Sequence, residues 1–426
     1  MYKYIDPFGK KCYLYSGDLG ELREKEDRIK RDQLDGLDIY MMGKATVNFV
    51  FDRYIRFKTE LRKTTYSNYI YTYDHYVRKG FGERKIAEIK YSDVLQFYTY
   101  LLEEEELSIS TLDSVHSVLH PTFDFAVRDE IIRNNPSDGV MKQLKKKFVN
   151  TAGVRKALTV DQQEAFMNAL EDPDNLRWSP IFTVMLGTGC RVGEIIGLRW
   201  EDVDFEDRIV DINHNVSYYP RRDGTYKCEY EVGLPKTDAG KRKIPMLGMV
   251  YDALMDEKKI QSDLGIECKS VIDGMSGFIF CNRYGEIHNP QALNRAIKRI
   301  STNYNAREEL RAKKEHRSPV MIPNFSNHIL RHTFCARLCE TETNIKVIQT
   351  IMGHKDIQTT MDIYAEVNET TKKESLEKLA GKYDTLFRSG KGSTSRGQKI
   401  KDFKAAEALA FELYELCHRW QVTMAA

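Results

Sequence analysis

The most informative stretch of this 426-residue sequence reads Asn327-His328-Ile329-Leu330-Arg331-His332-Thr333-Phe334. Side chains at positions i and i+3 of a helix share a face, so a helix that begins near Asn327 places His328 beside Arg331 and turns Leu330 the other way. His and Arg at the start of a helix are suited to binding phosphate. The stretch therefore predicts a phosphate-binding helix start above an apolar core, although core packing alone is the alternative.

A second, glycine-rich stretch reads Gly187-Thr188-Gly189-Cys190-Arg191-Val192-Gly193. It matches neither the dinucleotide motif nor the P-loop, which excludes NAD and ATP chemistry on this turn. Arg191 stands at the entrance of a short helix predicted for residues 192–198, where its charge opposes the helix dipole unless an anion lies in front of it. Glu194 lies three residues on and can brace Arg191. A purely structural Arg–Glu pair is the alternative.

A third stretch, residues 352–364, contains His354 and Tyr364, with a helix entry at Thr359-Thr360 between them. In chain order, Arg191, His328-x-x-Arg331, His354 and Tyr364 resemble the signature of the tyrosine recombinase (phage integrase) family, and in particular integrases of the phage lambda and conjugative-transposon type. The flanking words Gly-Cys-Arg-Val-Gly-Glu and Leu-Arg-His-Thr-Phe match as well. Lys236, in Pro235-Lys236-Thr237, is similar to the lysine of the family's β-hairpin.

The resemblance implies a role for each residue of this set. Arg191 and Arg331 neutralise the non-bridging oxygens of a DNA phosphate, Glu194 supports them, and His354 donates a hydrogen bond. A free tyrosine is ionised in only about one molecule in a thousand at pH 7, so Tyr364 as nucleophile needs a base, implied to be His328. Lys236 protonates the departing 5′-oxygen, leaving a 3′-phosphotyrosyl link. One ester replaces another, so no cofactor and no metal are expected.

The pattern of apolar spacing and turn residues predicts a multidomain, mainly α-helical protein with a mixed α/β catalytic domain. Four or five helices are expected between residues 46 and 135, and a strand-rich stretch between 203 and 246. With the resemblance, the expected domains are a partial arm-site-binding-like β-ribbon and helix (1–45), a helical, SAM-like core-binding domain (46–140), a basic linker (141–157), an integrase-type catalytic domain (158–387), and a basic tether with a C-terminal docking helix (388–426).

Both ends of the chain carry further expectations. Strands are predicted at residues 2–5 and 11–15, and a two-stranded ribbon is not stable alone. This unit is therefore expected to lack a strand that preceded Met1 or to draw support from elsewhere, as in a fragment of a longer integrase. Near the other end, Leu409, Leu413, Leu416 and Trp420 form one apolar helix stripe, which is expected to dock on its own subunit or a neighbour.

The overall charge points to no partner, because 65 Lys and Arg face 63 Asp and Glu, a net of +2. Residues 53–90, however, hold ten basic and four acidic side chains among many tyrosines. Basic and tyrosine side chains contact the DNA backbone, although a solvated helix face with buried rings is the alternative. The predicted DNA-contact residues are Arg53, Arg56, Lys58, Arg62, Lys63, Arg78, Lys79, Lys145, Lys146 and Lys147.

Several protein classes are excluded by what the sequence lacks. It has no apolar run approaching the roughly 18 residues of a membrane span, and its first residues do not resemble a signal or transit peptide. The eight cysteines include no CxxC pair, which favours free thiols over a disulfide scaffold or zinc ribbon. A bacterial cytoplasmic protein, associated with the nucleoid when on DNA, is expected.

The expected function is that of a site-specific DNA recombinase that integrates and excises a mobile element, either a transposon or a prophage. The resemblance implies double-stranded DNA core sites, and arm sites, as partners, with a homodimer on each site and a homotetramer in the synapse. Accessory DNA-bending and excisionase proteins are further expected partners. Two alternatives remain: DNA relaxation like that of a type IB topoisomerase, and a non-catalytic DNA-binding protein on the same fold.

Overall fold

The computed structural model describes residues 1–5, 11–34, 44–148, 156–222, 225, 227–234, 240–342 and 344–364. The chain divides into two compact units. The first comprises Met1–Phe334 with Ile351–Lys355, and the second comprises Cys335–Thr350 with the residues from Asp356 onward. Lys236 and the predicted tether and docking helix at 388–426 lie outside the described residues.

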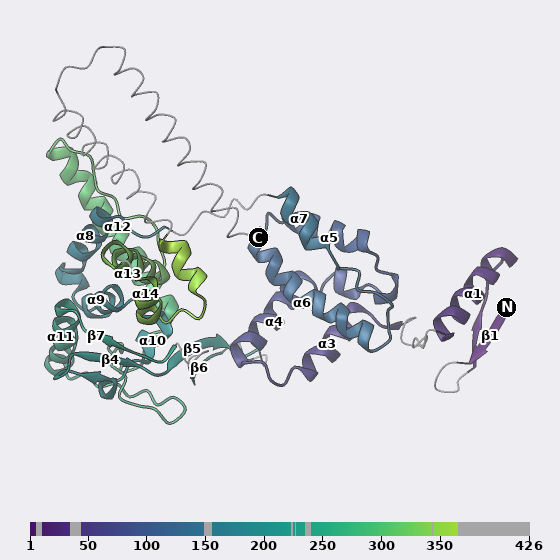
Figure 1. Ribbon diagram of the computed structural model, residues 1–426, viewed down its shortest axis with the longest axis horizontal. Coiled ribbons are helices and arrows are strands. Elements are labelled where there is room, and N and C mark those ends of the chain that lie inside the picture. Colours follow the sequence, from purple (N-terminus) through teal and green to yellow (C-terminus); the bar gives the residue numbers. More distant parts are fainter. Residues whose placement is uncertain are drawn as a thin grey trace, which may run out of the picture. The chain divides into compact units, whose positions relative to one another are not determined.

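The N-terminal segment forms the predicted ribbon and helix (Figure 1). Strands β1 (Tyr2–Ile5) and β2 (Lys11–Leu14) pair antiparallel, with Tyr2 opposite Leu14. Helix α1 (Leu19–Leu34) follows, and the side chain of Asp18 accepts a hydrogen bond of 3.0 Å from the backbone N–H of Gly20. The two strands and the helix expected from the sequence are confirmed.

Four helices between residues 47 and 128 pack around the first large hydrophobic core, as the sequence predicted. They are α3 (Val47–Phe57), α4 (Lys63–Tyr76), α5 (Tyr91–Glu103) and α6 (Ile109–Arg128), with 3₁₀ turns at Phe81–Glu83 and Ile86–Glu88. Thr46 and Ser108 cap α3 and α6 through their side-chain oxygens. The stacked rings of Phe51 and Tyr73, with centroids 3.5 Å apart, lie in this core. The core brings α3 and α4 together against α6.

The first part of the predicted basic linker is not a linker but a helix. Helix α7 (Val140–Lys147) packs on the same core, with Val140, Met141 and Leu144 buried. These three buried residues form an apolar stripe along one side of α7, and the lysines of the helix lie on the other side, which faces solvent. Counting charges alone missed this stripe, and residues 149–155 lie outside the described residues.

A second large core is built from helices and a small antiparallel sheet. The helices are α8 (Val160–Leu170), α9 (Ser179–Thr188), α10 (Val192–Gly197), α11 (Gly248–Leu264) and α12 (Pro290–Lys314). The sheet has the order β3 (Val203–Asp204), β4 (Ile209–Ile212), β7 (Arg242–Pro245), and β5 (Asn215–Pro220) pairs with β6 (Cys228–Gly233) as a hairpin. The strand-rich stretch predicted for 203–246 is confirmed.

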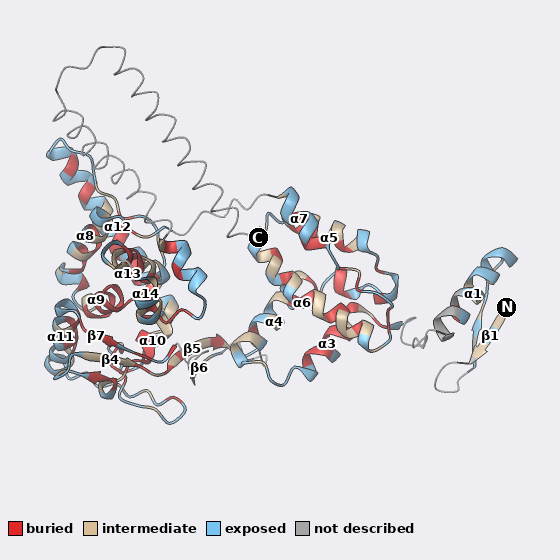
Figure 2. Ribbon diagram, in the orientation of Figure 1, coloured by how far each residue is buried: buried red, intermediate tan, exposed pale blue. Residues whose placement is uncertain are grey.

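Helix α9 forms the centre of this core, and every residue from Pro180 to Thr188 is buried (Figure 2). Thr159 caps α8 in a capping box with Gln162, and a 3₁₀ turn at Pro173–Asn175 separates α8 from α9. Proline cannot donate the backbone hydrogen bond that a continuous helix requires.

Helices α13 (Asn327–Thr341) and α14 (Ile345–Met352) follow, and residues 357–364 are helical as well. The mainly helical fold with small sheets confirms the predicted fold class. Within the described residues, no helix is long and apolar enough to cross a membrane. The six cysteines whose state is described, Cys190 among them, are free thiols, as predicted.

Candidate active site

Two glycines allow Arg191 to stand at the start of α10. Gly189 ends α9 in the left-handed conformation, with a φ of 61°, and a Cβ there would lie 2.3 Å from the ring of Phe334. A Cβ on Gly193 would lie 2.6 Å from the carbonyl oxygen of Val216 on β5. Only glycine fits both places, so α10 begins in direct contact with the hairpin strand.

Glu194 braces Arg191 as the sequence predicted. Its carboxylate accepts one 2.9 Å hydrogen bond from Nη1 of Arg191 and another of 2.9 Å from the backbone N–H of Arg191. Glu194 is buried, whereas 44% of the Arg191 side chain is exposed. The guanidinium group of Arg191 is therefore held in place by Glu194, and part of it is accessible to a ligand.

A second arginine, Arg242 of β7, binds the same carboxylate. Its Nη2 lies 2.8 Å from Oε2 of Glu194, and both side chains are buried. Burial by itself raises the pKa of Glu194, but the hydrogen bond and charge of Arg242, together with Arg191, more than offset this and lower it below its ordinary value. Glu194 is thus an ionised carboxylate shared by two arginines.

Arg331, on α13, lies deeper than Arg191 and has a different environment. Its Nη1 donates a 2.7 Å hydrogen bond to the carbonyl oxygen of Gly189, and its Nη2 donates one of 2.6 Å to Met352. Burial, then the charges of Arg191 and Arg242, lower the pKa of Arg331 to about 10. A buried cation whose hydrogen bonds go to neutral carbonyl groups is short of negative charge.

The two predicted histidines differ in exposure. His354 is buried, and burial together with the charges of Arg331 and Arg191 lowers its pKa to about 3, so its imidazole is neutral at physiological pH. His328 is exposed, and its ring meets that of His332 edge to face at 4.9 Å. A neutral imidazole can donate one hydrogen bond while its other nitrogen accepts one.

The structure therefore brings four of the predicted residues into one cluster: Arg191, Glu194, Arg331 and His354. Tyr364 lies in helical residues 357–364, which belong to the second compact unit, and is half-buried. The roles assigned to these four residues, and those of Tyr364, His328 and Lys236, remain predictions. Among the described residues, no group of three or more His, Cys, Asp or Glu side chains is arranged to hold a metal ion.

Arg242 is the member of the cluster that the sequence did not indicate beforehand. A usable signal was present, because Arg242 and Ile244 are two positions apart in a strand and so share a face. In the structure that face is the buried one. An arginine at a core-facing strand position must find buried partners, which marks it as structurally or functionally special.

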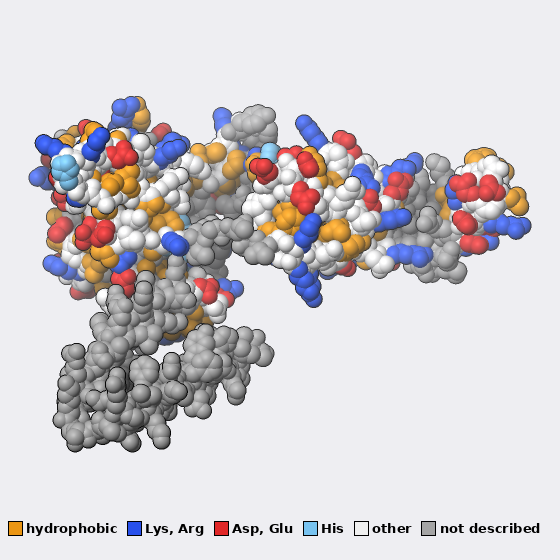
Figure 3. Space-filling model, turned by 90° about the horizontal axis from the view of Figure 1, so that it is seen from above, with side chains coloured by type: hydrophobic (Ala, Val, Ile, Leu, Met, Phe, Trp, Pro, Cys, Tyr) orange, Lys and Arg blue, Asp and Glu red, His pale blue; other side chains and the backbone are white. Residues whose placement is uncertain are grey.

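The predicted DNA-contact residues fall into two groups. Five of them pair with carboxylates of the protein: Arg53 with Asp129, Lys63 with Glu231, Arg78 with Asp52 and Asp74, Lys145 with Asp113, and Lys147 with Glu103. On the face shown in Figure 3, basic side chains are interspersed with acidic ones. The other five, all exposed, are Arg56, Lys58, Arg62, Lys79 and Lys146.

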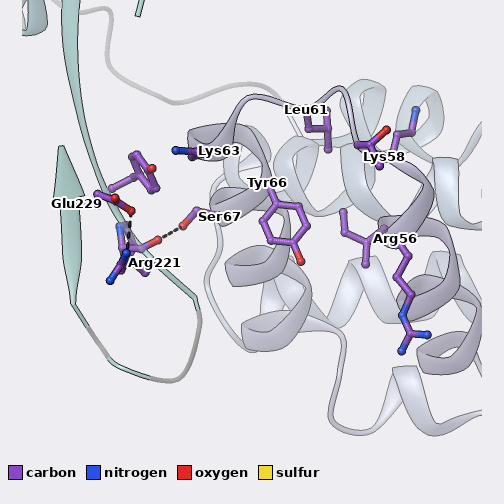
Figure 4. A pocket seen from close by; sticks show the side chains of 12 residues that line it. Arg56, Lys58, Leu61, Lys63, Tyr66, Ser67, Arg221 and Glu229 are labelled. Atoms are coloured by element: carbon purple, nitrogen blue, oxygen red, sulfur yellow. Dashed lines mark hydrogen bonds and ion pairs between the residues drawn. The ribbon is translucent and has the colours of Figure 1, made fainter. Parts of the chain in front are cut away.

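Three of the ten predicted DNA-contact residues, all of them exposed, line one groove. Arg56, Lys58 and Lys63 surround Tyr66 in a cavity of about 460 Å³ that β5 and β6 complete with Arg221 (Figure 4). Ser67 donates a 2.8 Å hydrogen bond to the carbonyl oxygen of Pro220 at its edge. Four basic side chains and one acidic one, that of Glu229, line the groove, so its net charge is positive, and none of the arginine cluster's residues lines it.

With the geometry described, the class of protein follows from comparison. Residues 156–371 match the phage integrase family, and the chain belongs to this family of tyrosine recombinases, which confirms the predicted family and enzyme class. It is 29% identical over 381 residues to the transposase from transposon Tn916 of Enterococcus faecalis, covering 86% of this chain and 88% of that one. It is 24% identical over 315 residues to the ICEBs1 integrase of Bacillus subtilis, covering 74% and 77%.

A solved structure gives the same answer for the fold. The Tn1549 transposon integrase, in complex with circular intermediate DNA, superposes with a TM-score of 0.62 at 26% sequence identity, covering 75% of this chain and 95% of that one. The similarity extends well beyond the residues of the family match.

Proposed function

We propose that this protein is a site-specific DNA recombinase that integrates and excises a mobile element through a 3′-phosphotyrosyl intermediate. The observation that carries the proposal is the charge of the cluster: it contains three guanidinium groups and one carboxylate, that of Glu194, which pairs with two of them, and His354 is neutral. Two positive charges are left over. A DNA phosphate in front of Arg191 and Arg331 supplies the missing negative charge.

The relatives support the kind of DNA transaction. The Tn916 transposase and the Tn1549 integrase, the latter in complex with circular intermediate DNA, belong to transposons. A transposon or related mobile element is therefore the favoured substrate, with double-stranded DNA at its joined ends as the core site. Arm sites are proposed for the N-terminal ribbon and helix.

The chemistry starts from the neutralised phosphate. The hydroxyl oxygen of Tyr364 attacks the phosphorus, His328 takes the phenolic proton, and the bond from phosphorus to the 5′-oxygen breaks. Lys236 gives the 5′-oxygen its proton, and His354 donates a hydrogen bond to the phosphate. In the reverse direction a 5′-hydroxyl from another strand displaces Tyr364 and rejoins the DNA. The proposal requires residues 357–364 to bring Tyr364 to the phosphate held by the arginines.

The proposed domain organisation and subunit assembly are those of a site-specific recombinase. Residues 46–140 act as the core-binding domain and 158–387 as the catalytic domain, with two subunits on each core site and four in the synapse. Accessory DNA-bending and excisionase proteins assist, and the protein acts in the bacterial cytoplasm on the nucleoid. The helix predicted near Leu409 is proposed to dock on a neighbouring subunit.

The decisive experiment uses a suicide DNA substrate that carries the joined ends of the element encoding this chain, with a nick that releases the 5′ fragment after cleavage. Wild-type protein should form a covalent protein–DNA adduct that survives denaturing electrophoresis. Tyr364→Phe should bind the same DNA without forming the adduct. Tyr284→Phe, at a tyrosine 64% exposed on the surface, is the matched control and should cleave like wild type.

Each other outcome has a defined meaning. An adduct from Tyr364→Phe shows that the nucleophile is assigned wrongly. Tight DNA binding without any adduct from wild type favours the non-catalytic DNA-binding alternative. Relaxation of supercoiled plasmid that lacks the element's ends, without recombination of plasmids that carry them, favours the topoisomerase-like alternative.

A further inference from the structure

All the hydrogen-bond donors of the Arg242 side chain bind partners inside the protein. Its Nε donates to the carbonyl oxygen of Ile351 at 2.8 Å, and its Nη1 donates to the carbonyl oxygen of Gly240 at 3.2 Å. Its Nη1 and Nη2 also donate to the two carboxylate oxygens of Glu194, at 3.2 and 2.8 Å, and Nη2 donates to Sγ of Cys190 at 3.5 Å. A guanidinium group has five N–H donors, and all five are engaged here. Arg242 has no donor left for a phosphate.

Arg191 presents the opposite picture. It shares Glu194 with Arg242, but 44% of its side chain is exposed, and its described side-chain hydrogen bonds, to Glu194 and Gly353, use two of its five donors. Arg191 can therefore bind a ligand while Glu194 holds it. The position of the Glu194 carboxylate, in turn, depends on the two bonds from Arg242.

The three arginines also grip three successive carbonyl groups. Arg242 binds that of Ile351 at 2.8 Å, Arg331 that of Met352 at 2.6 Å, and Arg191 that of Gly353 at 3.1 Å. These carbonyls lie at the C-terminus of α14, where a helix leaves its last acceptors unpaired and its dipole is negative. His354 is the next residue, so the arginines set where its backbone begins.

We propose that Arg242 is a positioning residue for strand cleavage: it fixes Glu194, and through it Arg191, and it fixes the segment that presents His354. This proposal rests on the proposed function. Arg242 does not contact the phosphate. Its contribution is to fix the positions of two donors to the phosphate relative to each other. One donor is Arg191, and the other is His354, whose backbone it helps to place.

A lysine cannot replace this arrangement. Its ammonium group has three donors on one atom, so it cannot reach Glu194, Gly240 and Ile351 from the separated nitrogens of a planar fork. Arg242→Lys keeps the buried charge opposite Glu194 but loses most of the geometry. A displacement of about 1 Å at a reacting group costs about 100-fold in rate. We therefore expect slow cleavage from a charged, folded variant.

The test compares two suicide substrates that differ at one atom group. One has a normal scissile phosphate, and the other has a methylphosphonate, in which a methyl group replaces one charged oxygen. Single-turnover cleavage is measured with enzyme in excess, and DNA affinity is measured separately. Arg242→Lys should lower the rate about 100-fold on the phosphate while the dissociation constant changes less than about twofold. On the neutral methylphosphonate the loss of rate should shrink to about tenfold or less. This phosphorus group carries no negative charge, so the rate depends less on how exactly the arginines are placed.

The matched control is Arg177→Lys. Arg177 also holds a buried glutamate, Glu257, at 2.7 Å and a backbone carbonyl oxygen, that of Cys281, at 2.8 Å. None of its described contacts involves the cluster. Its substitution should lower thermal stability while the phosphate and methylphosphonate rates stay in the wild-type ratio. Both variants are assayed below their melting temperatures, as judged by circular dichroism.

Two results overturn the proposal: cleavage by Arg242→Lys at the wild-type rate, or an equal loss on both substrates, which indicates general structural damage. If Arg242→Lys does not fold, E194Q breaks the same pair from the other side and must show the same substrate-dependent loss. If wild type forms no adduct on either substrate, the proposed function itself fails. The wild-type lane therefore separates that failure from the failure of the role given to Arg242.

Discussion

Arg331 and Gly189 are 142 residues apart in the sequence, yet a 2.7 Å hydrogen bond joins Nη1 of the arginine to the carbonyl oxygen of the glycine. Gly189 ends α9 two residues before Arg191, so this bond ties the deeper arginine to the turn that carries the more exposed one. Phe334, one helical turn beyond Arg331, packs within 2.3 Å of where a Cβ on Gly189 would lie. The turn and helix α13 therefore form one closely fitted unit.

Gly189→Ala tests this fit. An L-residue in the left-handed region costs roughly 1 to 2 kcal/mol, and the overlap with the Phe334 ring adds roughly 1 to 3 kcal/mol. We expect the free energy of unfolding to fall by about 2 to 5 kcal/mol in urea titrations. Gly265→Ala is the control, because Gly265 has the same φ of 61° with nothing within 4 Å of the added Cβ. Equal losses in the two variants would show that Phe334 does not press on Gly189.

The surplus positive charge of the cluster predicts stabilisation by anions. Phosphate that binds only the folded state, at about ten times its dissociation constant, raises the free energy of unfolding by about 1.4 kcal/mol. Thermal melts in phosphate, against chloride at equal ionic strength, should show this rise for wild type. Arg191→Gln should lose it. Arg307→Gln, which instead breaks the exposed pair with Asp172, should keep it, and a rise retained by Arg191→Gln would contradict the assignment.

One buried and two half-buried histidines predict acid sensitivity. Burial is the main cause that lowers the pKa of His116 and His288 to about 4 and that of His354 to about 3, from an ordinary value near 6.5. Between these values the unfolded chain binds more protons than the folded one, so stability is fully present above pH 6.5 and is lost as the pH falls toward 3. Urea titrations from pH 7.5 to 4 should show this decline.

His288→Gln tests one contribution to this decline. Near pH 5 it removes close to one proton from the difference between the unfolded and folded states. The slope of unfolding free energy against pH should therefore decrease by roughly 1 kcal/mol per pH unit. An unchanged slope would mean that His288 is protonated in the folded protein.

The groove around Tyr66 predicts part of the salt dependence of DNA binding. If Arg56 and Lys58 each neutralise one phosphate, removing both as alanine should lower the slope of log affinity against log salt by about 1.8. Binding should weaken on specific and non-specific DNA alike, as measured by fluorescence anisotropy across a salt series. Lys313→Ala, at an exposed lysine near the end of α12, should leave the slope unchanged. A double variant with the wild-type slope would remove this groove from the DNA interface.

Local signals in the sequence predicted much of the fold correctly. The β1–β2 ribbon pairs as expected, and Arg191 begins α10 with Glu194 hydrogen-bonded to it. Each of these depends on residues within a few positions of each other, where backbone geometry and side-chain chemistry are sufficient. The basic segment at α7 was misread, because its three apolar anchors are meaningful only against a core contributed from elsewhere.

The sequence by itself determined the family, the enzyme class and the residue types of the cluster, because these reside in short motifs whose chemistry is readable without coordinates. Only the tertiary structure decided which guanidinium group is exposed and which has all its donors bonded inside the protein. In the sequence, Arg191 and Arg242 are the same residue type. In the structure both bind the carboxylate of Glu194, but Arg242 is buried and Arg191 is exposed, so their roles differ. Burial and hydrogen-bond partners arise where α10, β7, α13 and the end of α14 meet, from residues up to 162 positions apart.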